Sequence, residues 1–186
     1  MPKRVTPMVG LLRGVNVGGR NKLPMADLRR IAAGCGFGDV STYVQSGNVV
    51  FTAPEGDTDA AAATLAAAIT ADTGISPAVT VRTAAELAAI VAANPYVDRT
   101  DDPTRLHVIF TVGGAVPDLG WYSPDDYAPE EVAVVDGETY LFLPDGIGRS
   151  KLAADVTRRS AKTGGGTARN WRSVLTLADM SAALSA

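Results

Sequence analysis

The chain has 186 residues, of which 46% are hydrophobic and 20% are charged, and its formal net charge is −3. This composition is that of a folded globular protein and excludes an intrinsically disordered chain. No apolar run approaches the roughly 20 residues that a membrane-spanning helix needs, and the N-terminal residues lack the apolar core of a secretion signal. The single cysteine excludes an intrachain disulfide, so we expect a cytoplasmic protein with no membrane association.

Charge is distributed unevenly along the sequence. Residues 1–30 together with 149–186 hold 14 basic and 3 acidic residues, whereas residues 31–148 hold 3 basic and 17 acidic residues. A local excess of positive charge attracts anions even when the whole molecule is negative. If the two ends of the chain meet in the fold, they form a basic face; otherwise the same cations are solvated on separate surfaces.

The first half of the sequence predicts a β-α-β-β-α-β order. A helix begins near Pro24 and stops at the glycines that follow it, and Ser46-Gly47 predicts a hairpin turn. The strands are expected over residues 8–12, 40–45, 48–52 and 79–82, and a second, alanine-rich helix over residues 58–72. This order is that of a ferredoxin-like, or split βαβ, module, which we place at residues 1–82.

The second half, residues 83–186, predicts a less regular α+β module with a C-terminal helix. Thr83 and Glu86 form a capping box that opens a helix, Asp136-Gly137 predicts a type I′ hairpin turn, and Asn170 caps the last helix. Strands are expected over residues 106–112, 131–136 and 138–143, a helix over 151–159, a loop with at most one helical turn over 113–130, and a flexible break at 164–166. The fold class is therefore α+β, with two ferredoxin-like modules of antiparallel-rich sheets and helices packed on them.

Several segments carry a resemblance to a known family. They are, in chain order, LLRGVNVGGRNKLPMADLRR, TYVQSGNVVF, the Asn94-Pro95 helix end, GIGRSKL and TARNWRSVLTL. This series, from Met8 to about Leu177, resembles a widespread bacterial family catalogued as domain of unknown function 1697. The resemblance implies a fold of two ferredoxin-like halves and a family without an established activity, and no catalytic residues come with it.

Two glycine-rich basic loops contain most of the candidate binding residues. The first basic loop (residues 13–22) and the second basic loop (residues 148–151) each precede an expected helix and share a Gly-Arg-x-Lys-Leu pattern. A glycine-rich turn at a helix N-terminus offers free N–H groups and the positive end of the helix dipole to an anion. We expect both loops to border one cleft, together with Arg169. The candidate anion-binding residues are Arg13, Asn16, Gly18, Gly19, Arg20, Lys22, Gly148, Arg149, Ser150, Lys151 and Arg169.

The first basic loop also has the outline of a phosphate-binding P-loop. Arg20 stands in place of the P-loop lysine and Asn21 in place of the Mg²⁺-binding hydroxyl, and no downstream Walker B strand is evident. A nucleoside triphosphatase is therefore disfavoured. The adjacent Gly18 and Gly19 predict a positive φ in this loop, because glycine reaches that region without steric cost.

Other chemically reactive residues have structural interpretations. His107 lies in the middle of a strand, Cys35 lies between two glycines, and Trp171 is interpreted as an anchor of the last helix. Neither the acidic pairs nor the Cys and His residues have the spacing of metal ligands, so no metal site is expected. The sequence identifies no cofactor and no oligomeric state, and it leaves open whether any reaction is catalysed.

Three functions remain open from the sequence. The first is the binding of a phosphorylated or carboxylated small molecule at the basic loops. The second is nucleic-acid binding through aromatic residues on the strands, at positions 43, 51, 140 and 142, although the signature of such RNA readers is absent. The third is a protein-interaction module or homodimer with no catalysis. Burial of the aromatic residues beneath helices would weaken the second function.

Overall fold

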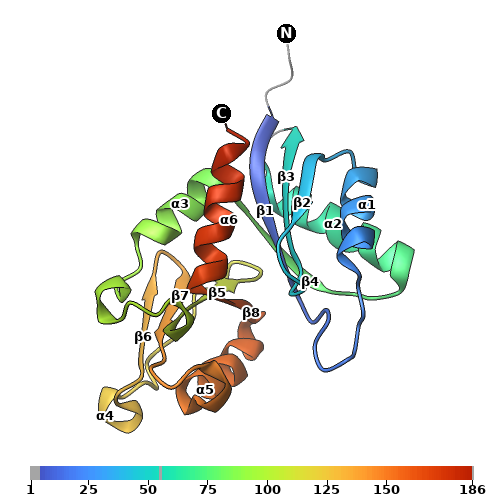
Figure 1. Cartoon of the computed structure of the whole chain (residues 1–186). Helices are drawn as coiled ribbons and strands as arrows, with labels where there is room; N and C mark the ends of the chain where they lie inside the picture. The colour runs from blue at the N-terminus through green and yellow to red at the C-terminus, as the bar shows by residue number, and fades with distance from the viewer. Residues whose placement is uncertain (1–4, 55, 186) are drawn as a thin grey trace. The chain divides into compact units, whose positions relative to one another are not determined.

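The structure is a computed structural model that describes residues 5–54 and 56–185 (Figure 1). The chain divides into two compact units: unit 1 comprises Met1–Ala89 and Thr176–Ala186, and unit 2 comprises Ile90–Leu175. The chain passes from unit 1 to unit 2 within a helix, α3 (Ala84–Ala92), and the module boundary at residue 82 expected from the sequence stays a prediction. Within the described residues, no helix combines the length and apolar character that crossing a membrane requires.

Unit 1 contains a four-stranded antiparallel sheet with the strand order β2-β3-β1-β4. Its elements are β1 (Val5–Arg13), α1 (Met25–Gly34), β2 (Gly38–Thr42), β3 (Asn48–Pro54), α2 (Thr58–Thr73) and β4 (Ala78–Thr83). The β-α-β-β-α-β order expected for the first half is thereby confirmed. Most strand boundaries differ from the expectation by one to three residues. The end of β2 is an example: it falls at Thr42, three residues early, and Val44 in the turn that follows has a φ of 50°.

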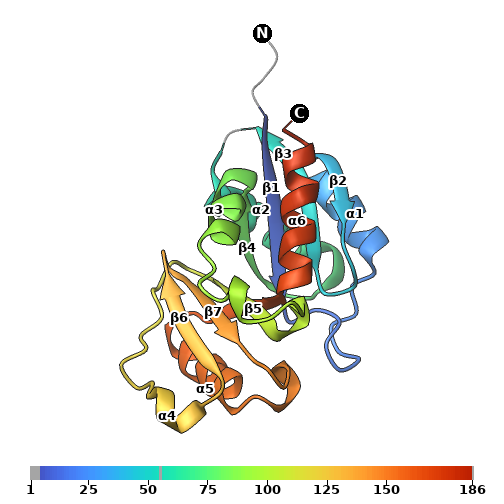
Figure 2. The same cartoon turned by 60° about the vertical axis from the view of Figure 1, so that its left-hand side comes forward.

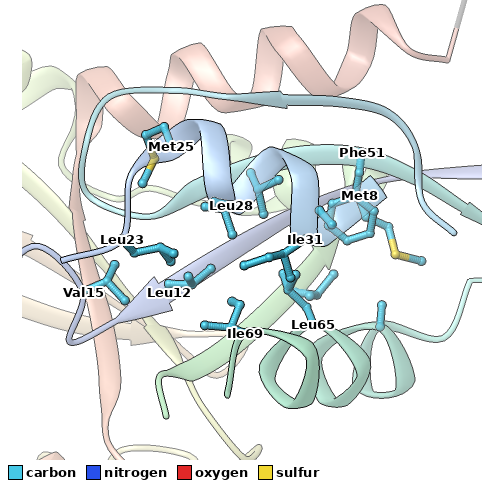
Figure 3. Packing of buried hydrophobic residues seen from close by; sticks show 14 of the residues in the cluster. Met8, Leu12, Val15, Leu23, Met25, Leu28, Ile31, Phe51, Leu65 and Ile69 are labelled. Carbon is cyan, nitrogen blue, oxygen red and sulfur yellow. The ribbon is translucent and has the colours of Figure 1, made fainter. Parts of the chain in front are cut away.

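The core of unit 1 lies between the sheet and helices α1 and α2 (Figure 3). Met8 and Leu12 of β1 point toward the helices, and Gly10 lies between them on the same face of the strand. A Cβ at Gly10 would lie 2.9 Å from Cγ1 of Val49 on β3 and 3.4 Å from Cδ2 of Leu65 on α2, so glycine leaves room for both side chains. The loop that follows β1 is anchored in the same core by Val15 and Leu23, which are both buried.

Unit 2 contains a second four-stranded antiparallel sheet, with the order β6-β7-β5-β8. Its neighbouring strands β6 and β7 are seen side by side in Figure 2. Its elements, after α3, are β5 (Leu106–Thr111), α4 (Pro124–Tyr127), β6 (Glu131–Val135), β7 (Glu138–Phe142), α5 (Lys151–Ser160), β8 (Gly166–Asn170) and the start of α6 (Trp171–Ala183). Short 3₁₀ helices cover Val97–Arg99, Pro103–Arg105, Ile147–Arg149 and Ala161–Thr163. When the strands of each unit are numbered in chain order, both sheets have the order second, third, first, fourth. The α+β class is confirmed.

Strand β8 was not expected from the sequence, which predicted a flexible break at its first residue. The strand pairs with β5, and Gly166 lies opposite Thr111. A Cβ at Gly166 would lie 2.5 Å from Cγ2 of Ile109 and 2.9 Å from the carbonyl oxygen of Phe110. Glycine is therefore required by a close approach between two strands, a reason that the sequence pattern does not reveal.

Several local predictions are confirmed by their hydrogen bonds. The backbone N–H of Thr83 donates to Glu86 Oε2 at 2.7 Å, and the N–H of Glu86 donates to Thr83 Oγ1 at 3.1 Å, which is the expected capping box. The N–H of Ser173 donates to Asn170 Oδ1 at 2.9 Å, so Asn170 caps α6. Asp136 and Gly137 have φ values of 49° and 86°, as a type I′ turn requires.

The last strand of each unit ends in the same Thr-x-Arg arrangement. Arg82 Nη1 donates to Thr80 Oγ1 at 2.7 Å and to the Val81 carbonyl at 3.0 Å. Arg169 Nη1 donates to Thr167 Oγ1 at 2.6 Å and to the Ala168 carbonyl at 2.9 Å. Each arginine is followed by a residue that caps the next helix, Thr83 or Asn170. The two units therefore share this local arrangement as well as their strand order.

The Gly-Arg-x-Lys-Leu pattern shared by the basic loops does not follow the shared strand order. Residues 19–23 lie between β1, the first strand of unit 1, and α1, whereas residues 148–152 follow β7, the third strand of unit 2, and include the first two residues of α5. The two segments therefore occupy different positions in the strand order, and their likeness is not part of the structural repeat.

Candidate functional site

The first basic loop folds as a small hairpin. Val17 and Arg20 form an isolated antiparallel bridge, and the Arg20 N–H donates to the Val17 carbonyl at 3.0 Å. Gly18 and Gly19 form the turn between them, with φ values of 57° and 75°. The positive φ expected from the sequence is thus confirmed at both glycines. A Cβ at either glycine would meet nothing within 4 Å, so the requirement for glycine is conformational.

Two asparagine side chains hold this hairpin in place. Asn16 Nδ2 donates to the carbonyls of Leu23 at 2.9 Å and Gln45 at 2.8 Å, and Asn16 Oδ1 accepts from the Leu23 N–H at 2.8 Å. Asn21 Nδ2 donates to the Gly14 carbonyl at 2.8 Å. Both asparagines have a positive φ, which asparagine tolerates better than most residues. The loop is therefore held by its own hydrogen bonds in one conformation.

Asn16 is the residue on which this conformation depends most. We expect Asn16→Ala to lower the free energy of unfolding by about 2 kcal/mol, because three hydrogen bonds are lost and alanine is strained at a φ of 54°. Asn21→Ala is the matched control, since it keeps the same kind of strain and loses one hydrogen bond; about 1 kcal/mol is expected. Urea denaturation measures both, and equal losses would contradict the central role of Asn16.

The cations of the first basic loop are exposed. Among the residues that the structure describes, no carboxylate lies within ion-pair distance of Arg13, Arg20 or Lys22. The loop itself contains no acidic residue. Within the same described part of the chain, the amides of Gly18 and Gly19 donate no hydrogen bond. Donors and positive charge therefore face solvent together at one turn.

The turn of the first basic loop does not lie at the N-terminus of α1, in contrast to the expectation. Helix α1 begins at Met25 with Pro24 at its N-cap, and buried Leu23 separates it from the cations. The turn at Gly18-Gly19 thus lies well before the helix, and its amides are not those of the first helical turn. The loop precedes a helix that begins at Pro24–Met25, as expected, but its glycine amides do not lie at the helix N-terminus, because the hairpin and Leu23 lie between them.

The second basic loop leads directly into α5, but the protein already occupies that helix N-terminus. Ser150 Oγ accepts from the Ala153 N–H at 2.8 Å as the N-cap, and Glu130 Oε2 accepts from the Leu152 N–H at 3.1 Å. A hydroxyl and a carboxylate thereby satisfy the amides that the sequence analysis assigned to a ligand. Gly148 lies in a 3₁₀ turn, and a Cβ there would meet nothing within 4 Å.

The cations of the second basic loop share a hollow with carboxylates. Arg149 and Lys151 line this hollow together with Asp126, Glu130 and Asp145. Lys151 Nζ lies 5.2 Å from the centre of the Tyr127 ring, a cation–π distance. Acidic residues outnumber the basic ones around the hollow, so its field favours an anion less than that of the first basic loop.

The first basic loop belongs to unit 1 and the second to unit 2, so a shared cleft stays a prediction.

Arg169 and Trp171 are both buried. Burial lowers the pKa of Arg169 to about 10, and its guanidinium donates to its own strand, as described above. Trp171 is 6% exposed, as expected for an anchor of the last helix. The contribution of Arg169 to a ligand site stays a prediction.

The two residues with nucleophile or base chemistry show no activated geometry. Cys35 is half-buried, and burial raises the pKa of its thiol, which disfavours the thiolate. His107 is buried, and burial lowers its pKa to about 4. Among the described residues, no three His, Cys, Asp or Glu side chains are grouped so that they could hold a metal ion.

The aromatic residues proposed as a nucleic-acid platform are largely inside the protein. Phe51, Tyr140 and Phe142 are buried, and Tyr140 donates its hydroxyl to the Ile90 carbonyl at 2.9 Å. Phe51 stacks on Phe37 with 4.3 Å between the ring centres. Only Tyr43 of the four is partly exposed. The burial of these rings weakens the hypothesis that nucleic-acid bases stack on the sheet, because a base needs an exposed ring face.

A comparison with known protein families shows which family the chain belongs to. A family model described as a protein of unknown function, DUF1697, matches residues 5–140. The chain belongs to this family. The matched residues include the first basic loop and stop before the second. The DUF1697 assignment confirms the resemblance seen in the sequence and brings no activity with it.

The fold of this DUF1697 chain is similar to that of a solved bacterial protein. It is described as a conserved bacterial protein, SP0830, from Streptococcus pneumoniae, with a TM-score of 0.75 and 20% sequence identity over 96% of this chain and 99% of that chain. At this identity the likeness concerns the fold alone. A comparison with curated proteins finds no match.

Proposed function

We propose that this protein binds a phosphorylated or carboxylated anion at the first basic loop, residues 13–22. The observation that carries the proposal is the set of exposed cations that have no ion pair among the described residues. They lie on a loop that contains no acidic residue and that the side chains of Asn16 and Asn21 hold by hydrogen bonds. A preorganised loop loses little conformational entropy when it binds, so its contacts contribute more of their free energy to affinity.

Three kinds of donor support an anionic ligand. The guanidinium of Arg20 offers paired N–H groups that match a phosphate or carboxylate, and Lys22 adds a compact positive charge two residues away. The amides of Gly18 and Gly19 lie in the same turn and have no acceptor among the described residues. Phosphorylated metabolites are cytoplasmic, and the single cysteine is consistent with that compartment.

The test is a thermal and calorimetric titration with sodium tripolyphosphate. We expect the wild-type protein to be stabilised in a saturable way, by about 2.7 kcal/mol at 100 times the dissociation constant. Arg20→Ala/Lys22→Ala should remove this effect and keep the fold, because both side chains are exposed. Acetate and a short single-stranded RNA, used as further probes, separate simple carboxylates and nucleic acid from polyphosphate.

The matched control removes the same charge from the other loop. Arg149→Ala/Lys151→Ala changes the net charge by the same amount and should retain tripolyphosphate binding, because carboxylates surround those cations. Equal weakening by the two double variants would indicate a nonspecific charge effect and would refute the assignment. The absence of any wild-type response would do the same.

A further inference from the structure

Unit 2 contains a hollow of about 200 Å³ beside the end of α5. Its apolar wall consists of Leu119, Trp121 and Val156. Arg159, Ser160 and Lys162 are polar residues of the same lining. An apolar lining with a few polar groups is the usual composition of a small-molecule site.

The apolar wall is held in place by its neighbours. Trp121 Nε1 donates to the Asp118 carbonyl at 2.9 Å, and the Trp121 ring meets the ring of Tyr127 edge-on with 5.9 Å between centres. Leu119 and Trp121 pack against the core cluster that contains Val156. The wall is therefore formed before any ligand arrives, which lowers the entropic cost of binding.

Arg159 is placed to meet a carboxylate. Its guanidinium carbon lies 4.5 Å from the centre of the Trp121 ring, a stacked cation–π arrangement. Within the described residues Arg159 has no ion pair, whereas its neighbour Arg158 binds Asp155 at 2.5 Å. Stacking uses the face of the guanidinium and leaves N–H groups on its edge for a planar acceptor.

The charge around the hollow also favours an anion. Arg159 and Lys162 are its two cations, and Asp118 is the one carboxylate among its described lining residues. The negative end of the α5 dipole opposes an anion here, but the end is capped: the Ser160 carbonyl accepts from the Gly165 N–H at 2.8 Å and from Thr163 Oγ1 at 3.1 Å. As cations near the C-terminus of α5, Arg159 and Lys162 also stabilise that helix. Helix stabilisation alone does not require Arg159 to stack on Trp121.

We propose that this hollow binds a small carboxylate with a single ring, whose ring lies against Trp121 and Leu119 and whose carboxylate meets Arg159 and Lys162. A dry cavity of roughly 150 Å³ accommodates benzene, so about 200 Å³ accommodates one ring with a carboxylate group. This site lies within unit 2 and is independent of the first basic loop.

The test uses benzoate as the probe and tryptophan fluorescence as the readout. Benzoate should quench the fluorescence saturably, and benzyl alcohol, which has the ring without the charge, should bind at least tenfold more weakly. Trp121→Phe should abolish the benzoate-dependent signal, since the other tryptophan, Trp171, is buried. Calorimetry on the same samples separates binding from nonspecific quenching.

The adjacent arginines provide the matched control. Arg159→Gln should weaken benzoate binding at least tenfold, whereas Arg158→Gln, which removes the same charge one residue away, should leave it unchanged. Arg20→Ala/Lys22→Ala should also leave it unchanged, which separates this site from the first basic loop. Non-saturating quenching, equal affinity for benzyl alcohol, or equal effects of the two arginine variants would each overturn the proposal.

Discussion

Gly47→Ala is expected to lower the free energy of unfolding by about 3 kcal/mol. Gly47 is buried and has a φ of 81°, a conformation that costs an L-residue roughly 1–2 kcal/mol. A Cβ there would lie 2.7 Å from Cγ2 of Val15 and 2.8 Å from Cβ of Leu12, and overpacking of this kind costs roughly 1–3 kcal/mol. The Gly47 carbonyl also accepts from the Leu12 N–H at 2.9 Å, so the hairpin cannot move away freely.

The control for Gly47→Ala is Gly19→Ala. Gly19 also has a positive φ, 75°, but a Cβ there meets nothing within 4 Å. It should therefore show the backbone strain alone, about 1 kcal/mol. Urea denaturation of the three proteins gives the difference directly. If both variants lose the same free energy, the clash with Val15 and Leu12 has been relieved and the packing argument is wrong.

Acidification is expected to destabilise the protein through His107. Burial lowers the pKa of His107 to about 4 in the folded state, against about 6.5 in an unfolded chain. Below pH 6.5 the unfolded state gains a proton that the folded state does not take up, so stability falls as the pH falls from about 6.5 to about 4. The full loss across this window is about 3 kcal/mol.

His107→Leu isolates this effect from that of the carboxylates. Nδ1 of His107 is buried and has no hydrogen-bond partner among the described residues, so leucine removes a buried polar atom and little else. The difference in stability between the two proteins should be constant near neutral pH and should grow by about 3 kcal/mol as the pH falls to about 4. His107 is the only histidine, so its proton resonances also report the pKa directly. Parallel curves, or a measured pKa near 6.5, would refute this account.

Local signals were sufficient to predict most of the fold. The Thr83–Glu86 capping box, the Asp136-Gly137 turn and the Asn170 cap each depend on residues close together in sequence, and each is present. Strand β8 was missed because its residues show no apolar alternation and because Gly166 is needed only where β5 approaches it. The left-handed Val44 was missed for a related reason, since a β-branched residue normally favours an extended strand.

The candidate site was predictable in composition but less so in geometry. The cations and glycines of the first basic loop are evident in the sequence, whereas the bond from Asn16 to the Gln45 carbonyl spans 29 residues and is not. The carboxylate of Glu130, which occupies the N-terminus of α5, comes from a segment read as loop. The hollow beside Trp121 was missed because its residues are distant in the chain, although the aromatic residues at 121, 122 and 127 were a signal of packing there.

The central claim is that an anion binds at the first basic loop, and amide chemical shifts during a titration with tripolyphosphate test it most directly. The largest, saturable shifts are expected at the amides of Gly18, Gly19 and Arg20, with loss of these shifts in Arg20→Ala/Lys22→Ala. Shifts confined to residues 148–151, or no saturable shift anywhere, would contradict the claim.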